Sequence, residues 1–197
     1  MKRVQFNRLT SHVAPLLMDD VDTDQIIPAR YLKVTDKQGL GEGLFAEWRY
    51  DRQGNTDPEF ALNLSQAQGA EILLVGRNFG CGSSREHAVW ALLAKGIRVV
   101  IAQSFADIFR GNALKNGLLV VQIGQSVHAK LAEMVVAAPS TEVTVDLASQ
   151  ELLIPDLGGV QFAIDEFSKR CLIEGLDSLG YLLSAETHIR KYEASHE

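Results

Sequence analysis

The run Gly76-Arg-Asn-Phe-Gly-Cys-Gly-Ser-Ser-Arg-Glu-His-Ala88 decides how this chain folds. The apolar stretch 71–75 leads into it, and the apolar-periodic stretch 88–94 leads out of it. This order predicts a strand, a glycine-rich turn and a helix. The glycines at 76, 80 and 82 allow positive φ angles and the close approach of another molecule.

The end of this turn carries groups that suit a negative ion. The spacing places Ser83, Ser84 and Arg85 on the first turn of the following helix. At that position free N–H groups and the positive end of the helix dipole favour an anion. The sequence therefore predicts a site for a carboxylate or a phosphate.

A structural alternative stays open for the same residues. Ser83 and Glu86 fit the Ser-x-x-Glu capping box, so Ser83 could do no more than cap the helix. His87 could act as a base for Ser83, although packing or hydrogen bonding explains the Glu86–His87 pair more simply. Cys81 lies where a thiol pKa can be lowered, but no base partner is visible in the sequence, which favours a small residue that fills the turn.

An acidic loop precedes the central motif. Asp20, Asp22 and Asp24 have the spacing that opens an EF-hand calcium loop, but Gln25 and Tyr31 stand where that loop needs glycine and glutamate. A metal is therefore the less favoured interpretation. The alternative is a helix N-terminus capped by Asp22 or Asp24.

Three apolar runs, beginning at residues 71, 97 and 118, alternate with helical stretches. They predict a βαβαβ core with a parallel sheet covered on both faces. Ser104 is expected to cap the second helix, 105–115, and Asn116-Gly117 to end it.

The flanking segments complete one α/β body of residues 1–197. Short strands are expected at 4–6 and 13–17, and the glycines of 34–43 indicate a mobile loop before a short helix within 44–50. A strand at 141–147, with 151–154 and 159–163, predicts added antiparallel strands. Helices are expected at 127–138, after Asp165 as far as Gly175, and from 178 to 193; the last two stand at the C-terminal end.

Composition excludes several classes of protein. The 197 residues are 46% apolar, but no apolar run reaches the roughly 18 residues of a membrane span. The net charge of −6 and the absence of a basic block argue against nucleic acid as a partner. No apolar segment follows the basic N-terminus, so no signal peptide is expected. Two widely separated cysteines then predict reduced thiols and a cytoplasmic location.

Beyond these patterns, residues 78–88 resemble the signature of the swivel domain of the aconitase superfamily. Segments 22–28, 44–50 and 104–109, together with 116–119, are similar to the small subunit of bacterial 3-isopropylmalate dehydratases. The resemblance implies a swivelling β/β/α domain. It also implies a hydro-lyase of leucine biosynthesis that isomerises 2-isopropylmalate to 3-isopropylmalate through 2-isopropylmaleate.

The resemblance also implies a second subunit. Superfamily members use a [4Fe-4S] cluster with one open iron, and such a cluster takes three or four Cys thiolates. This chain has only Cys81 and Cys171. We therefore expect no metal and no cofactor in this chain, the cluster on a large iron–sulfur subunit, and an active site at the heterodimer interface. The segment 34–59 is expected to be disordered or displaced without that partner.

Site residues follow from the resemblance position by position. It implies that Ser83 is the catalytic base, acting as an alkoxide, and that Arg85 grips a substrate carboxylate beside Ser84. The segment 31–33 resembles the part of the family that selects the substrate. There Leu32 suits an isopropyl group, whereas Lys33 could point away or favour a longer triacid.

Two alternatives remain. Lys33 supports a homoaconitase-type or methylmalate-type hydratase subunit. The other is a non-catalytic scaffold that binds anions and whose serine only caps a helix.

Overall fold

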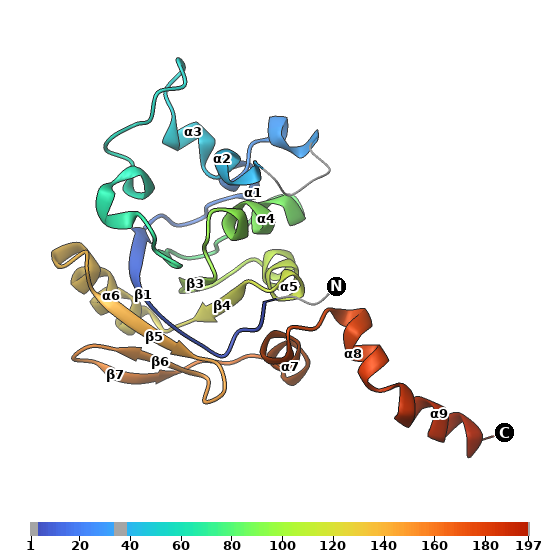
Figure 1. The fold of residues 1–197 in the computed structure, drawn as a ribbon. Coiled ribbons are helices and arrows are strands. Elements are labelled where there is room, and N and C mark those ends of the chain that lie inside the picture. The colour runs from blue at the N-terminus through green and yellow to red at the C-terminus, as the bar shows by residue number, and fades with distance from the viewer. Residues whose placement is uncertain (1–3, 34–38, 197) are drawn as a thin grey trace.

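The computed structural model describes residues 4–33 and 39–196, and of Lys33 only the backbone (Figure 1). One mixed sheet has the strand order β4-β3-β2-β1-β5-β6-β7. Its strands are β1 (Arg8–Leu16), β2 (Ile72–Val75), β3 (Val99–Ala102), β4 (Leu119–Gln122), β5 (Glu142–Asp146), β6 (Glu151–Ile154) and β7 (Gly158–Gln161).

The helices lie before, between and after these strands. The α-helices are α1 (Thr23–Ile26), α2 (Leu40–Gly43), α3 (Ala46–Arg49), α4 (Glu86–Ala94), α5 (Asp107–Asn116), α6 (Gln125–Ala137), α7 (Glu166–Glu174), α8 (Ser178–Ser184) and α9 (Glu186–Ala194). Short 3-10 helices are η1 (Ala29–Lys33), η2 (Ala61–Asn63) and η3 (Ser65–Ala67).

Strand β1 joins two differently built halves of the sheet. Its residues 13–16 pair in parallel with β2, and its residues 8–12 pair antiparallel with β5. The predicted separate strand at 4–6 was wrong. There Phe6 is buried and its N–H donates to the Leu172 carbonyl at 2.9 Å, so this segment is held by α7 and not by a strand.

The parallel half confirms the predicted βαβαβ core. Strands β2, β3 and β4 pair in parallel, and every residue of β2 and β3 is buried. Their connections run through α4 and α5, and α5 ends at Gly117 with φ 89°, as expected. An apolar strand covered on both faces needs no alternation, which explains the continuous apolar runs.

The antiparallel half confirms the predicted added strands, which pair as a meander, although β7 begins one residue earlier and ends two residues earlier than expected. Asp165 caps α7, and Gly175 ends it with φ 66°, both as predicted. The helical tail is also confirmed, as α8 and α9. No helix in the described ranges combines the length and the apolarity that crossing a membrane requires.

The glycine-rich loop expected at 34–43 was wrong over its described part. Residues 40–43 form α2, and Leu40, Leu44 and Phe45 are buried in the core. A Cβ at Gly41 would lie 3.3 Å from the Ala94 carbonyl carbon at the end of α4. The glycines here permit close helix packing. From the sequence alone, a glycine-rich segment that packs closely cannot be distinguished from one that is mobile. Residues 34–38 of this prediction lie outside the described residues.

Candidate active site

The glycine-rich turn after β2 is built by close packing. Gly80 and Gly82 have φ angles of 78° and 85°, in the left-handed region. A Cβ at Gly80 would overlap the Phe109 ring, and one at Gly76 would overlap the Met18 carbonyl. Positive φ is confirmed at Gly80 and Gly82 but not at Gly76. The close approach found at Gly76 and Gly80 is that of the chain's own residues, so the expected approach of another molecule stays a prediction.

Hydrogen bonds connect the segment around the start of α1 to this turn. The Gly80 N–H donates to the Val21 carbonyl at 2.8 Å, and the Thr23 N–H donates to the Cys81 carbonyl at 2.9 Å. The Thr23 hydroxyl donates to the Ser83 carbonyl at 2.7 Å. The backbone that presents Ser83 is therefore fixed by a segment 60 positions earlier in the chain.

Two carboxylates of the acidic loop have structural partners. Asp22 caps α1 by accepting from the Gln25 N–H at 2.8 Å, and the Gln25 side chain returns a bond to the Asp22 N–H. Asp20 accepts from the Asn78 side-chain amide at 2.8 Å. The capping role expected for Asp22 is confirmed.

Helix α4 begins later than predicted. Glu86 is its first residue, and Arg85 is its N-cap, with φ −133° and ψ 103° and no capping side-chain bond. Ser83 and Ser84 lie in the turn ahead of the helix, so both their placement on its first turn and the Ser83–Glu86 capping box were wrong. Glu86 instead accepts from the Asn116 side chain on α5 at 2.7 Å, which draws it away from Ser83.

A cavity of about 260 Å³ brings the predicted anion-binding residues together. Its walls are formed by Thr23, by the end of the glycine turn and by the first residues of α5: Gly80, Gly82, Ser83, Ser84, Arg85, Ala106, Asp107, Ile108 and Phe109. Ala106 is the N-cap of α5, and no side chain caps this helix. The first N–H groups of α5 therefore lack partners within the helix. The positive helix end at this cavity comes from α5, and sequence reasoning missed it.

Ser104 explains why α5 is left uncapped. Its hydroxyl was expected to cap the helix, but it accepts from the Asn78 N–H at 2.8 Å instead. The Phe79 N–H donates to the Ser104 carbonyl at 3.1 Å, and the Ala106 N–H donates to the Phe79 carbonyl at 3.0 Å. Ser104 thus ties the loop after β3 to the glycine turn, and α5 starts three residues after it.

The two serines differ in their surroundings. The side chains of Ser83 and Ser84 are exposed at the cavity. The Ser84 hydroxyl accepts a long hydrogen bond of 3.5 Å from Asn112 on α5. Within the described part of the chain no hydrogen bond of the Ser83 hydroxyl is found.

Arg85 forms a two-pronged ion pair with Asp24. One terminal nitrogen donates to Asp24 Oδ2 at 2.7 Å, and the other donates to Oδ1. The Arg85 side chain is 16% exposed, whereas Asp24 is 54% exposed. A guanidinium has five N–H donors, so three remain for a ligand. Asp24, which could have been a metal ligand or a cap, orients the arginine.

The other reactive side chains of the motif are structural. Burial raises the pKa of Cys81, as do the charges of Asp22 and Asp20, and its thiol donates to the Asp20 carbonyl at 3.3 Å. A raised thiol pKa disfavours the nucleophilic thiolate. His87 packs on the Trp90 ring with centroids 4.7 Å apart and not against Ser83, as the packing interpretation expected.

The predicted substrate-selecting residues lie elsewhere. Leu32 belongs to η1 and packs, partly buried, against the core; it does not line the Ser83 cavity. The side chain of Lys33 lies outside the described part of the structure. Their role in substrate choice stays a prediction.

The donor set for an iron–sulfur cluster is not met in the described ranges. No three His, Cys, Asp or Glu side chains gather there in a group that could hold an ion. Cys81 lies in the glycine turn and Cys171 is buried in α7, and no disulfide joins them.

The chain is similar to a known domain family and to known proteins. The aconitase C-terminal domain family matches residues 4–126. A 3-isopropylmalate dehydratase small subunit from Roseiflexus sp. (strain RS-1) is 56% identical over 187 residues, which cover 95% of this chain and 92% of that protein. One from Anaeromyxobacter dehalogenans (strain 2CP-1) is 51% identical over 185 residues, 94% of this chain and 95% of its own.

A solved structure shares the fold. It is a 3-isopropylmalate dehydratase from Methanocaldococcus jannaschii, similar to this chain with a TM-score of 0.67 and 28% identity, over 94% of this chain and 99% of the other. The predicted fold class is confirmed by this likeness.

Proposed function

This chain belongs to the family of 3-isopropylmalate dehydratase small subunits, and on that premise we propose that it supplies half of the active site of a hydro-lyase. The other half belongs to a large subunit. The observation that carries the proposal is the convergence of Ser83, Ser84, Arg85 and the uncapped start of α5 on one cavity. Such a set of donors suits a hydroxy-dicarboxylate substrate.

Ser83 is the proposed base. As an alkoxide its Oγ takes the proton from the carbon next to the hydroxyl-bearing carbon of 2-isopropylmalate. The C–H electron pair becomes the double bond of 2-isopropylmaleate, and the hydroxyl leaves. Addition of water in the opposite orientation, with the serine returning the proton, gives 3-isopropylmalate.

A serine hydroxyl is a poor base unless its alkoxide is stabilised. No base side chain forms a hydrogen bond with the Ser83 hydroxyl among the described residues, so the proposed stabilisation is electrostatic. The positive end of α5 and the Arg85 guanidinium, both lining the cavity, supply it.

Arg85 and Ser84 are the proposed carboxylate binders. Asp24 holds two N–H groups of Arg85 and so fixes the plane of the guanidinium. The remaining N–H groups of Arg85, the Ser84 hydroxyl and the first N–H groups of α5 are left for the substrate.

The leaving hydroxyl needs a Lewis acid, and we place the [4Fe-4S] cluster that supplies it on the large subunit. The residues of this chain do not form its ligand set in the described ranges. We also place the enzyme in the cytoplasm, because Cys81 and Cys171 are not joined by a disulfide.

Reconstitution tests the proposal. The chain is mixed with its iron–sulfur large subunit, and 2-isopropylmaleate is followed by its ultraviolet absorbance. Ser83→Ala should lower kcat by about 10²- to 10⁴-fold and leave co-elution of the subunits unchanged. Ser126→Ala, at an exposed site on α6, is the matched control and should keep full activity. Full turnover by Ser83→Ala would remove this serine from the mechanism.

Substrate choice is tested separately. Comparison of kcat/KM for isopropyl-substituted and carboxyalkyl-substituted malates decides between the proposed enzyme and the homoaconitase-type alternative. The scaffold alternative depended on Ser83 as a helix cap, and Ser83 does not cap α4.

A further inference from the structure

We propose that α8 and α9, residues 178–194, form a docking arm for the large subunit. The inference rests on the proposed function, because it names the surface by which that subunit is held. We call these residues the C-terminal arm.

The arm carries an apolar stripe that the rest of the chain leaves uncovered. Its members recur every three or four positions within each helix, so each helix presents them on one face. They are 42–65% exposed: Leu179, Leu182 and Leu183 on α8, and Ile189 and Tyr192 on α9.

The arm leaves the body of the molecule, as the red ribbon in Figure 1 shows, and none of its residues is buried. It is anchored at its base. Asp177 caps α8 by accepting from the Gly180 N–H at 2.7 Å, and Tyr181 packs edge-on against Phe167 of α7 with ring centroids 4.8 Å apart. Isolated helices of this length are marginal in water, so burial of the stripe against another protein would stabilise both helices.

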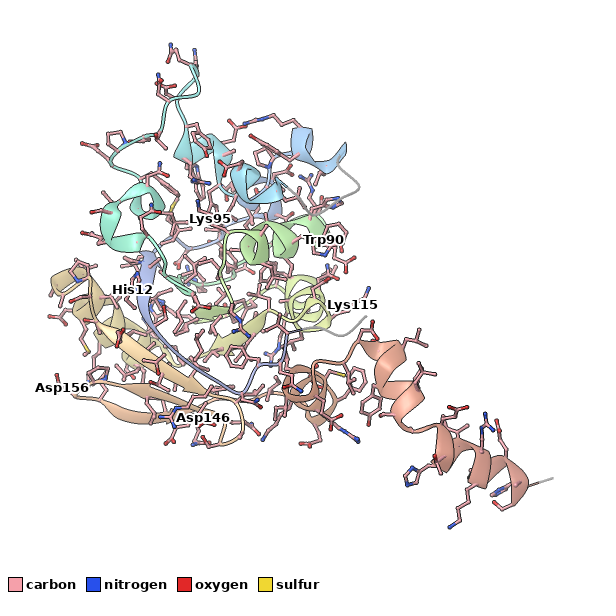
Figure 2. The ribbon with its side chains drawn as sticks, in the orientation of Figure 1. His12, Trp90, Lys95, Lys115, Asp146 and Asp156 are labelled. Atoms are coloured by element: carbon pink, nitrogen blue, oxygen red, sulfur yellow. The ribbon has the colours of Figure 1, made fainter. Side chains whose placement is uncertain are left out.

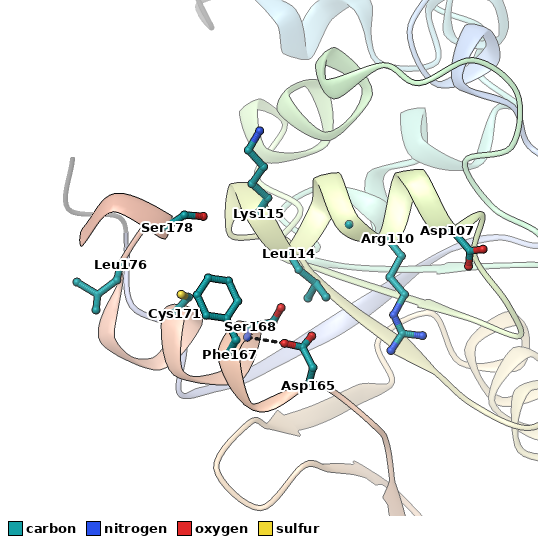
Figure 3. Close-up of a pocket in the computed structure, with 11 residues that line it drawn as sticks. Asp107, Arg110, Leu114, Lys115, Asp165, Phe167, Ser168, Cys171, Leu176 and Ser178 are labelled. Atoms are coloured by element: carbon teal, nitrogen blue, oxygen red, sulfur yellow. Dashed lines mark hydrogen bonds between the residues drawn. The ribbon is translucent and has the colours of Figure 1, made fainter. Parts of the chain in front are cut away.

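The base of the arm lines a second cavity that neighbours the Ser83 cavity. This second cavity, of about 310 Å³, separates Leu176 and Ser178 from Asp107 and Arg110 on α5 (Figure 3). Asp107 also lines the cavity that holds Ser83. The two cavities are therefore neighbours across the first turn of α5.

Exposed apolar side chains continue across this junction. Ile108, which lines the Ser83 cavity, is 58% exposed, and Phe167, beside the arm, is 45% exposed. A protein that covers the reaction cavity would contact this surface and then the arm.

This continuity identifies the large subunit as the occupant. Under the proposed function the large subunit must cover the Ser83 cavity, and the arm begins at the second cavity, which shares Asp107 with it. A second copy of this chain bound there would bring a second Ser83 but not the half of the active site that the large subunit supplies, so the site would stay incomplete.

A binding measurement tests the arm. The chain is titrated with the iron–sulfur large subunit under anaerobic conditions, and the Kd of Leu182→Asp/Leu183→Asp is compared with that of the unaltered chain. Two central interface leucines predict a Kd raised by about thirtyfold or more. Ser184→Asp, which adds a charge on the opposite side of α8, should change it by less than about twofold.

Three further measurements guard the interpretation. A chain ending at Leu176 lacks the arm and should bind as weakly as the double variant. At saturating large subunit, the double variant should keep the kcat of the unaltered enzyme, because neither leucine lines the cavity of Ser83. Circular dichroism should show the same melting temperature for the body of each chain.

Specific results would overturn the inference. An unchanged Kd for both altered chains would remove the arm from the interface. Loss of self-association in the ultracentrifuge, with the Kd for the large subunit unchanged, would assign the arm to a second copy. A complex that assembles through the arm but forms no 2-isopropylmaleate would instead count against the proposed function and leave the docking inference standing.

Discussion

The parallel half of the sheet, β2, β3 and β4, differs from the antiparallel half, β5, β6 and β7, in how it is buried. Every residue of β2 and β3 is buried, whereas β5 alternates and β7 has no buried residue. The site residues 83–85 and the start of α5 follow β2 and β3 at their carboxyl ends, where open α/β sheets place their ligands. The difference teaches that the site residues follow strands whose side chains are buried on both faces of the sheet. The strands of the antiparallel half are at least partly exposed on one or both faces and carry no site residue.

Two glycines with positive φ test this contrast most strongly. Gly80 in the parallel half has φ 78° and lies against Phe109, and Gly158 at the start of β7 has φ 77° with nothing within 4 Å of its Cβ position. The left-handed backbone costs an alanine about 1–2 kcal/mol, and overpacking adds about 1–3 kcal/mol. Gly80→Ala should therefore lower the free energy of unfolding by about 3 kcal/mol, and Gly158→Ala by about 1 kcal/mol. Urea denaturation of both variants measures the gap; equal losses would contradict the contrast.

Arg85→Lys sharpens the comparison at the site itself. Lysine keeps the charge but loses the planar fork that pairs with Asp24 and, as proposed, with the substrate. A charge-assisted hydrogen bond is worth about 1.5–3 kcal/mol, so kcat/KM should fall by about 10- to 150-fold.

The matched control for this change is Arg170→Lys on α7, where the arginine pairs with Glu174 at the surface. It should leave steady-state rates unaltered. A normal kcat/KM for Arg85→Lys would show that the fork does not hold the carboxylate.

The smallest effect is expected in the antiparallel half, where Asp146 lies on β5 (Figure 2). A hydrogen bond from the Ser149 N–H at 3.1 Å lowers the pKa of Asp146, and Arg8, 3.7 Å away, contributes. Because the folded-state pKa lies below the unfolded value of about 3.9, the stabilisation is complete above about pH 4 and is lost as the pH falls through the lower folded pKa.

Asp146→Asn should thus cost less than about 1 kcal/mol at pH 7, and the difference should shrink toward zero in acid. Chemical denaturation along a pH series provides the measurement. Asp156→Asn, at the β6–β7 turn, serves as the control. A difference that grows in acid would show that the sign of this linkage is wrong.

Much of the fold could be predicted because its signals are local. The apolar runs of β2 and β3 and the stop at Gly117 each depend on a few neighbouring residues. The antiparallel pairing of β1 with β5 could not be predicted in this way, because it joins residues far apart in the sequence, such as Thr10 and Thr144, which are 134 positions apart.

The site was only partly predictable for the same reason. The residues Ser83, Ser84 and Arg85 were found from their spacing, and they share a cavity. What spacing could not reveal is competition between partners. Asn116 takes Glu86 away from the capping box, and Ser104 bonds to the glycine turn in place of α5.

Because β1 pairs with both halves of the sheet, it affects the order in which the sheet can form during protein synthesis. Thr10 of β1 and Thr144 of β5, whose hydroxyls are 2.7 Å apart, are separated by 134 positions. On the ribosome the first strand emerges early and then waits, at about 5–20 residues per second, until nearly three quarters of the chain has been made. The nascent polypeptide therefore completes the antiparallel half of its sheet late, well after the residues that line the Ser83 cavity, the last of which is Phe109, have been made.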